Sequence, residues 1–234
     1  MTLLDNHNIG PFLFTFLPAL IYALIIYTYS AAKINIRKAL IHFTIGTCGI
    51  FIAADMVPFV FPNWRNRIYG DEMVSLFTFA LVQVACLEEA IKFVLFKISY
   101  SKREFNPLTT MFYCVCVSCG FAVAENLIYA NMFGTSVLLI RAFTAIPMHI
   151  IFGVIMGYFI SVGKIKSIGK HGIESAGIAM SYSTIGVLAA ALLHGIYDFV
   201  GFQGMIDKIW WIVIFSVAGA YSLINDLIIK TKNL

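Results

Sequence analysis

The sequence has little charge: 12% of its 234 residues are Asp, Glu, Lys or Arg, whereas 60% are hydrophobic. Soluble domains carry about a quarter charged residues, so this composition and a mean hydropathy of +0.88 exclude an ordinary soluble domain. Long polar connectors are also lacking, since segments such as "KINIRK" and "NWRNRIYGDE" are too short to fold alone. The five cysteines all fall within apolar runs, which excludes a disulfide framework. We therefore expect a multi-pass protein of the cell membrane, with the lipid bilayer as its surroundings.

Seven apolar stretches approach the length of about 20 residues that crosses the hydrocarbon core of a bilayer. They cover residues 11–32, 39–62, 73–98, 108–131, 137–162, 177–200 and 208–229. No repeat or low-complexity segment divides them. The sequence therefore predicts one all-α domain over residues 1–234, a polytopic bundle of about seven transmembrane helices.

Lysine and arginine are unevenly divided between the connectors. Alternate connectors and the C-terminal end hold Lys33, Arg37, Lys38, Lys97, Lys102, Arg103, Lys164, Lys166, Lys170, Lys230 and Lys232. The other side holds only Arg65, Arg67 and Lys208. Because basic residues beside spans stay preferentially in the cytoplasm, we expect the N-terminus outside and the C-terminus in the cytoplasm. The net charge of +4 is then a topology signal, and no nucleic-acid partner is expected.

Ionisable side chains within the spans are few, and they are the informative ones. A charge near the bilayer centre costs about 3 kcal/mol on insertion scales, so such residues usually face the protein interior and have a function. Consecutive spans contain Glu88, Glu89 and Lys92, then Glu125 and Asn126, then Arg141 and His149, then His194 and Asp198. This set predicts a hydrated cavity inside the bundle.

The spacing of these residues decides which of them share a helix face, because residues three or four apart are neighbours. Lys92 follows Glu88 by four positions and Glu89 by three, so it can neutralise one of the two carboxylates. Adjacent glutamates point about 100° apart, so their roles should differ. His194 and Asp198 are four apart, a spacing at which a carboxylate can orient an imidazole.

Several of these residues also have a structural interpretation. The pair of Glu89 and Lys92 could be an intrahelical ion pair, and Asn126 could bond between helices. We expect His42 to lie at the cytoplasmic interface and Arg141 to extend outward to the opposite one.

Three classes of function suit a cavity with carboxylates and imidazoles. A proton or ion pathway would use them as a relay, a metal site would use two histidines and a carboxylate, and a metal-free hydrolase would use a glutamate as general base on water. A transporter usually has paired broken segments, which are not seen here, and the spaced histidine pair of zinc proteases is lacking. The hydrolase requires least: a desolvated Glu, a His and a donor such as Asn126.

The ordered motifs make a family resemblance specific. They are Glu88-Glu89-x-x-Lys92, Phe121-x-x-x-Glu125-Asn126, His149-x-x-x-Gly153 and His194-x-x-x-Asp198. Together they resemble the PrsW family of intramembrane proteases over a core of about residues 75–200, a family related to the CAAX-prenyl proteases and bacterial Abi proteins. The resemblance implies cleavage of a membrane-anchored protein, which for the name-giving member is an anti-sigma factor in regulated intramembrane proteolysis.

The resemblance also implies roles for the first and last motifs. Glu88 would be the general base that activates water, and Glu89 would support it with Lys92 as counter-ion. His194 would contact the water or the oxyanion, with Asp198 beside it.

Two of the motifs depart from the CAAX pattern. Glu125 stands where those relatives have a histidine, and Asp198 where they have an asparagine. The missing hydrogen-bond donor would then come from His149 or Asn126, and both stay open.

The expected activity is thus a glutamic-type intramembrane endopeptidase. A non-catalytic membrane protein that moves protons or ions through the same cavity is the alternative. No cofactor is expected, because Lys92 would place a positive charge beside any cation. Zinc remains possible, held by Glu88, Glu125, His149 and His194, which would make the protein a metalloprotease. We expect these four side chains to converge on one cavity in the outer half of the bundle.

Overall fold

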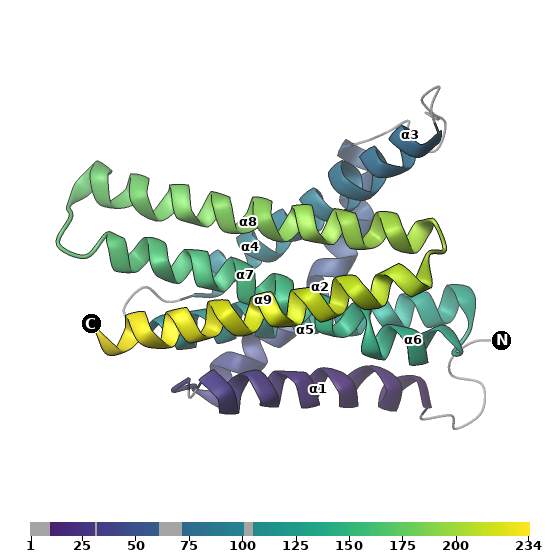
Figure 1. The fold of residues 1–234 in the computed structure, drawn as a ribbon, viewed down its shortest axis with the longest axis horizontal. Helices are drawn as coiled ribbons and strands as arrows, with labels where there is room; N and C mark the ends of the chain where they lie inside the picture. The colour runs from purple at the N-terminus through teal and green to yellow at the C-terminus, as the bar shows by residue number, and fades with distance from the viewer. Residues whose placement is uncertain (1–9, 31, 61–71, 101–104) are drawn as a thin grey trace.

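The computed structural model describes residues 10–30, 32–60, 72–100 and 105–234, and no strand is found within these ranges. In chain order the helices are α1 (Gly10–Ser30), α2 (Ile36–Val60), α3 (Glu72–Thr78), the π-helix η2 (Phe79–Cys86), α4 (Leu87–Ser99), α5 (Pro107–Phe133), α6 (Val137–Phe143), α7 (Ala145–Lys166), α8 (Gly172–Phe202) and α9 (Ile206–Lys232). Figure 1 shows them as one bundle. The predicted all-α fold is confirmed.

Within the described ranges, six helical stretches are long and apolar enough to cross a membrane. They are Leu13–Ser30, Ile36–Met56, Pro107–Phe133, Val137–Lys166, Gly172–Phe202 and Ile206–Lys232. The remaining predicted stretch, 73–98, is covered by α3, η2 and α4, which follow one another without a break. Inside hydrocarbon the backbone has no water to bond, so helices are the outcome. The chain is a multi-pass membrane protein, as predicted.

The core is built around α5, which is buried on nearly all sides. It packs against α1, α2, α4 and α7, while α8 and α9 cover the far side of α7. The outward faces of the peripheral helices are apolar, with exposed residues such as Leu20 on α1 and Phe215 on α9. In lipid, apolar faces of this kind need no protein partner, whereas polar groups do. The polar side chains are therefore found in the centre of the bundle.

The crossing of α2 and α5 depends on glycine. A Cβ atom added to Gly120 would lie 2.0 Å from the Phe43 carbonyl oxygen, and one added to Gly46 would lie 2.0 Å from that of Val117. The hydroxyl of Thr47 donates to the Gly120 carbonyl at 3.3 Å. Small residues let membrane helices approach backbone to backbone, so no larger side chain fits this crossing.

The start of α5 is fixed by its cap. The side chain of Asn106 accepts a hydrogen bond from the Thr109 amide at 3.0 Å, and Pro107 occupies the first helical position. The hydroxyl of Thr109 then donates to the Lys33 carbonyl at 2.7 Å, which ties the connector before α2 to α5. The cap thereby fixes the phase of the helix that carries Glu125.

The fifth span is interrupted between α6 and α7. Pro147 has no N–H to give to the Phe143 carbonyl, and the helix breaks at Thr144, whose φ is −119°. The hydroxyl of Tyr197 donates to that of Thr144 at 3.2 Å, so α8 braces the break. His149 follows in the first turns of α7.

The two ends of the bundle differ in charge. In Figure 1 the α7–α8 connection and the C-terminus lie at one end, and the α8–α9 connection and α3 lie at the other. The first end carries Lys164, Lys166, Lys170 and Lys230 near its helix termini. Arg65, Arg67, Lys102 and Arg103, with the predicted end of the second span, lie outside the described residues. The cytoplasmic orientation of the basic end stays a prediction.

Candidate active site

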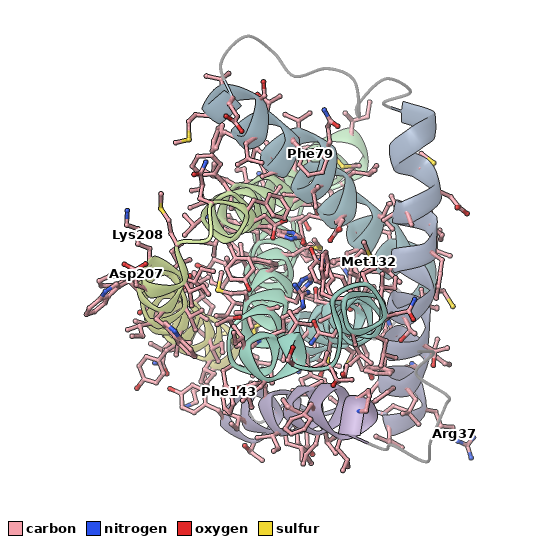
Figure 2. The ribbon with its side chains drawn as sticks, turned by 90° about the vertical axis from the view of Figure 1, so that its right-hand side faces the viewer. Arg37, Phe79, Met132, Phe143, Asp207 and Lys208 are labelled. Atoms are coloured by element: carbon pink, nitrogen blue, oxygen red, sulfur yellow. The ribbon has the colours of Figure 1, made fainter. Side chains whose placement is uncertain are left out.

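Polar side chains meet in the middle of the bundle, between α4, α5, α7 and α8. Figure 2 views the bundle from the end at which Met132, Phe143, Asp207 and Lys208 lie, with nitrogen and oxygen atoms visible among the central helices. Glu89, Lys92, Asn126, His149 and His194 are all buried there. A buried charge is tolerated only with partners, so the contacts of each group define what it can do.

Glu89 is held by two donors. Its Oε1 atom lies 2.6 Å from Lys92 Nζ and 2.9 Å from His194 Nδ1. Because a carboxylate oxygen accepts, the His194 ring carries a proton on Nδ1 and donates it to Glu89. The predicted ion pair of Glu89 and Lys92 is confirmed, and Glu89 also orients the His194 ring.

Lys92 fixes the tautomer of a second histidine. Its Nζ atom lies 3.0 Å from His149 Nδ1, and an ammonium can only donate. A neutral His149 ring must therefore accept at Nδ1 and carry its proton on Nε2. That Nε2 atom lies 2.9 Å from Glu125 Oε2, so His149 links Lys92 to Glu125.

Glu88 differs from its neighbour. Its Oε2 atom lies 3.9 Å from both Lys92 Nζ and His194 Nε2, which is too long for a hydrogen bond. Among the residues that the structure describes, this buried oxygen has no hydrogen-bond partner. The two adjacent glutamates thus have different environments, as their 100° separation on a helix predicted.

The second ring nitrogen of His194, Nε2, faces a carboxylate of its own helix. Its Nε2 atom lies 3.3 Å from Asp198 Oδ2 on the same helix, so the predicted pairing at a spacing of four is present. Its ring stacks on Phe152, with ring centroids 4.6 Å apart. The His149 and His194 rings are 5.2 Å apart, edge to face. The aromatic wall limits water around the imidazoles and strengthens their polar contacts.

Arg141 belongs to the cluster, which the sequence did not predict. Its Nη2 atom lies 3.0 Å from Glu125 Oε1, and its Nε donates to Asn126 Oδ1 at 2.6 Å. The guanidinium carbon lies 3.7 Å from the centroid of the Tyr129 ring. The expectation that Arg141 extends outward was wrong, since its side chain is only 12% exposed. The sequence did contain a signal for this pairing. Glu125 has no basic partner on its own helix, and the next helix in the chain carries Arg141.

Asn126 has only one way to face this arginine. A guanidinium has donors and no acceptor, so the amide must present Oδ1 to Arg141 and turn Nδ2 away. Nδ2 is buried and has no hydrogen-bond partner among the described residues. Asn126 therefore keeps an N–H donor available within the cluster.

His42 does not join the cluster. Its Nδ1 donates to the Lys38 carbonyl at 2.6 Å, and its ring stacks on Tyr113 at 4.6 Å. The residue is 2% exposed, so it lies inside the protein, and its position at the cytoplasmic interface stays a prediction. It packs inside the basic end of the bundle.

The π-helix η2 leads directly into the motif that begins at Glu88. A Cβ atom added to Gly195 of α8 would lie 2.8 Å from Leu81 Cα in η2, so the two backbones are nearly in contact. π-Helical turns are rare and often occur at functional sites. Here the wide turn and Gly195 together set how Glu88 and Glu89 face His194.

The four side chains expected to converge do so. Glu88 faces His194, His149 contacts Glu125, and the two histidine rings adjoin. Glu125 and His194 each lie eight residues before the last residue of their helices, Phe133 and Phe202. The cluster is thus nearer the end opposite the lysines, which is the outer half if the predicted orientation holds.

The comparisons with known proteins cover this whole region. A family profile described as "PrsW family intramembrane metalloprotease" matches residues 35–221, which include every residue of the cluster. The chain belongs to the PrsW family.

Individual relatives agree with this assignment. The chain is 35% identical over 128 residues to Protease PrsW of Oceanobacillus iheyensis, covering 54% of this chain and 55% of that protein. It is 34% identical over 121 residues to Protease PrsW of Geobacillus kaustophilus, covering 51% and 50%, and 31% identical over 116 residues to that of Bacillus subtilis, covering 49% and 50%. The chain spans about half the length of these curated relatives. No solved structure matches it.

The description of the PrsW profile as a metalloprotease raises the question of whether the cluster could hold zinc. Its donor chemistry fits, since imidazole nitrogens and carboxylate oxygens are ordinary zinc ligands and one buried Glu88 oxygen is unpartnered. The spatial arrangement of these donors fits zinc less well. Among the described residues, no three His, Cys, Asp or Glu side chains surround a common point that could hold a metal ion. His149 and Glu125 bond to each other instead.

Proposed function

We propose that this PrsW-family protein is an intramembrane endopeptidase that hydrolyses a peptide bond of a membrane-anchored protein, with Glu88 as general base on water. The observation that carries the proposal is the contrast between the paired glutamates. Glu89 holds Lys92 and His194 through Oε1, and its side chain is fully buried, so its unpartnered Oε2 atom is closed to solvent. Among the described residues Glu88 Oε2 accepts from neither group, at 3.9 Å from each, and the Glu88 side chain is 11% exposed. A base needs a free oxygen that water can reach, and a counter-ion does not.

The proposed reaction uses Glu88 twice. Glu88 takes a proton from water as the water oxygen attacks the carbonyl carbon of the scissile peptide. When the tetrahedral intermediate collapses, the C–N bond breaks and Glu88 returns the proton to the leaving nitrogen. His194, whose Nε2 faces Glu88, helps to position the water.

The developing oxyanion needs an N–H donor, and the contacts favour Asn126 over His149. His149 Nε2 lies 2.9 Å from the Glu125 carboxylate, whereas Asn126 Nδ2 has no partner among the described residues. A donor that is already oriented need not reorganise during the reaction, which is the source of oxyanion-hole stabilisation. Arg141 is then a positioning residue, because it holds the amide with Nδ2 turned away from itself.

Zinc is retained as an alternative. When bound by Glu88, Glu125, His149 and His194, it would activate a water molecule and polarise the scissile carbonyl. The metal-free base is the preferred form of the proposal, because the Lys92 ammonium lies beside His149 and repels a cation.

The substrate is proposed as a single-span membrane protein, with an anti-sigma factor as one candidate class. The PrsW relatives are named proteases, which supports a peptidase. Comparative proteomics of membranes with and without the active protein should reveal a substrate that accumulates intact.

Cleavage by purified protein tests the proposal. Glu88→Gln should abolish cleavage of such a substrate in detergent, while Glu72→Gln, the same change at an exposed position on α3, should leave it unchanged. Equal rates for Glu88→Gln and the unmodified protein would refute the mechanism. Proton flux into liposomes that Glu88→Gln removes, without any cleavage, would support the proton-transfer alternative.

A further inference from the structure

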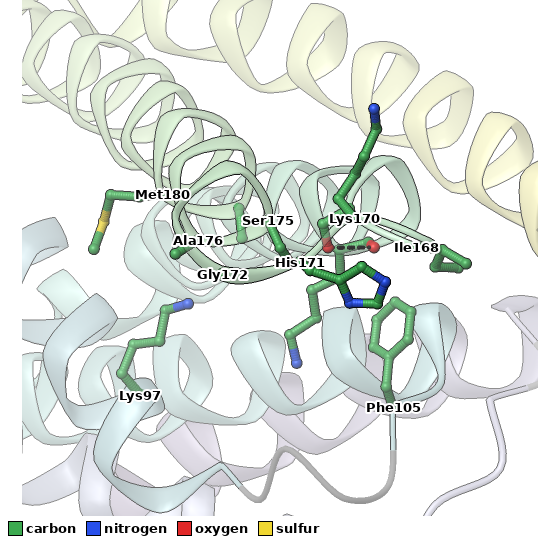
Figure 3. A pocket seen from close by; sticks show the side chains of 12 residues that line it. Lys97, Phe105, Ile168, Lys170, His171, Gly172, Ser175, Ala176 and Met180 are labelled. Atoms are coloured by element: carbon green, nitrogen blue, oxygen red, sulfur yellow. Dashed lines mark hydrogen bonds between the residues drawn. The ribbon is translucent and has the colours of Figure 1, made fainter.

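Helix α8 borders a cavity at one end and the candidate active site near the other. At the basic end of the bundle its first turns line a cavity of about 700 Å³, where Figure 3 shows Ser175 and Met180. None of the described residues that line this cavity belongs to the central cluster. Near its last turns α8 carries His194 and Asp198, and between them lies Tyr197, which is only 7% exposed. The proposed reaction assigns no role to this buried tyrosine.

Tyr197 contacts the break between α6 and α7. Its hydroxyl donates to Thr144 Oγ1 at 3.2 Å, and Thr144 Oγ1 donates in turn to the Ile140 carbonyl at 2.9 Å. A hydroxyl has one proton to donate and lone pairs that accept, so both bonds can exist together. Thr144 is 1% exposed, which keeps water from replacing either bond. The two bonds form a chain from α8 to the last turn of α6.

The break that Tyr197 contacts has cluster residues on both sides. Arg141 lies three residues before Thr144, and His149 lies five residues after it. Both contact Glu125, which is 3.0 Å from Arg141 Nη2 and 2.9 Å from His149 Nε2. Glu125 therefore holds the two sides of the break from α5, while Tyr197 holds the break itself from α8. Together these contacts fix the angle between α6 and α7.

The two sides of the proposed reaction come from different helices. The general base Glu88 has its Oε2 atom 3.9 Å from His194 Nε2 on α8. The proposed oxyanion donor, Asn126, is held by Arg141 on α6 at 2.6 Å. Both groups must act on one peptide carbonyl, and a misplacement of about 1 Å can cost about 100-fold in rate. A direct bond between α8 and the α6–α7 break keeps these two sides in register.

We propose that Tyr197 is a positioning residue of the proposed protease. Through the α6–α7 break and Arg141, its hydroxyl holds Asn126 at a fixed distance from the general base. The inference rests on the proposed function and adds a residue that need not touch the substrate. The hydroxyl is the group that acts, because a phenylalanine ring at the same position would fill the same space. Without it, Thr144 loses its contact with α8, and the angle of the break is less restricted.

Steady-state cleavage of the single-span substrate by Tyr197→Phe tests the inference. We expect kcat to fall about fivefold to tenfold with little change in KM, because one neutral hydrogen bond that orients the donor is lost. The matched control is Tyr158→Phe, which removes the bond from the Tyr158 hydroxyl to Asp226 Oδ2 at 2.6 Å between α7 and α9. No helix residue of the cluster comes from α9, so this variant should change kcat by less than about twofold. Equal kcat in Tyr197→Phe and the unmodified protein would overturn the inference.

A double-mutant cycle separates positioning from a general effect on stability. If Tyr197 acts through Asn126, Tyr197→Phe should lower kcat by less than about twofold once Asn126→Asp has removed the donor. Losses that multiply would mean that the hydroxyl acts elsewhere, and they would overturn the inference. Thr144→Val removes the same bond from its other side, and it should reproduce the loss in kcat if Tyr197→Phe does not fold. Full activity of a folded Thr144→Val protein would also contradict the proposal.

Amide hydrogen exchange tests the same contact without cleavage. The Met148 amide donates to the Thr144 carbonyl at 3.1 Å, so it reports on the break. Tyr197→Phe should accelerate exchange in this segment, and Tyr158→Phe should not. Unchanged exchange in Tyr197→Phe would refute the positioning role. The proposed function fails separately: cleavage by Glu88→Gln refutes the mechanism, whereas an inactive Glu88→Gln with a fully active Tyr197→Phe refutes only the role of Tyr197.

Discussion

Arg141 Nε donates a hydrogen bond to Asn126 Oδ1 at 2.6 Å, and this contact decides which end of the amide remains available. The arginine comes from α6 and the asparagine from α5, two helices joined by a short turn at Gly134. Because the guanidinium can only donate, the amide N–H group must point elsewhere. The proposed oxyanion donor therefore depends on a residue that need not touch the substrate.

Asn126→Asp separates these two functions. The carboxylate can still accept from Arg141, so the helix pair should stay in place, but the N–H donor is gone. We expect kcat to fall about 100-fold or more with little change in KM, as when one oxyanion donor is removed. Steady-state cleavage of the single-span substrate measures this. Turnover close to that of the unmodified protein would assign the donor elsewhere.

The companion variant Arg141→Lys tests positioning. Lysine can pair with Glu125 but cannot hold Asn126 with the same planar fork. We expect kcat to fall about tenfold while thermal stability changes little. Equal activity in Arg141→Lys and the unmodified protein would reduce Arg141 to a structural ion-pair partner.

Glu89→Gln should reduce activity for a different reason from Glu88→Gln, namely through a loss of stability. Neutralising Glu89 leaves the buried Lys92 ammonium without its counter-charge, because a glutamine oxygen still accepts a hydrogen bond but carries no charge. Breaking a buried pair by removing one partner costs about 3–5 kcal/mol. We therefore expect Glu89→Gln to lower the thermal unfolding temperature in detergent markedly, and Glu88→Gln to lower it little. A stable but inactive Glu89→Gln protein would instead give Glu89 a direct role in the chemistry.

Gly120→Ala should destabilise the bundle without touching the cluster. The new methyl group would meet the Phe43 carbonyl oxygen at 2.0 Å, so α2 and α5 would have to separate. Overpacking of this kind costs about 1–3 kcal/mol or more. Gly219→Ala on α9, where nothing lies within 4 Å of the added atom, is the matched control and should be neutral. Thermal unfolding of the two variants in the same detergent measures this. Equal unfolding temperatures would contradict the predicted clash between α2 and α5.

Metal removal distinguishes the two forms of the proposed mechanism. Because Lys92 lies against His149, we expect cleavage to survive exhaustive chelation. Elemental analysis of active protein, followed by chelation and zinc addition, measures this. Stoichiometric zinc with loss and recovery of activity would establish Glu88, Glu125, His149 and His194 as candidate ligands.

Hydropathy was sufficient for the approximate positions of six of the seven predicted spans, because a bilayer leaves the backbone few choices. The seventh predicted span, 73–98, is covered by α3, η2 and α4 and is not among the six helical stretches found in the described residues. The same argument identified the submerged polar residues. It could not identify η2, because residues 79–86 are apolar apart from Gln83. A run of this kind has no amphipathic pattern from which a change of helical pitch can be inferred.

Contacts between helices were also beyond the sequence. The pairing of Glu89 with Lys92 was predicted because both lie on one helix, three residues apart. The pairing of Glu125 with Arg141 was missed because it depends on how α5 and α6 are rotated about their axes. Spacing within a helix is readable from sequence, whereas rotation between helices is set by packing.

The distribution of ion pairs bears on how the chain enters a membrane during synthesis. Lys92 and Glu89 travel on one helix, so the third span can be inserted with its charges already paired. Glu125 finds Arg141 only after α6 has followed α5 through the turn at Gly134, so these two segments should partition into lipid as a hairpin. We expect nascent chains truncated before residue 137 to leave α5 poorly inserted, and longer ones to integrate fully, which glycosylation mapping can follow.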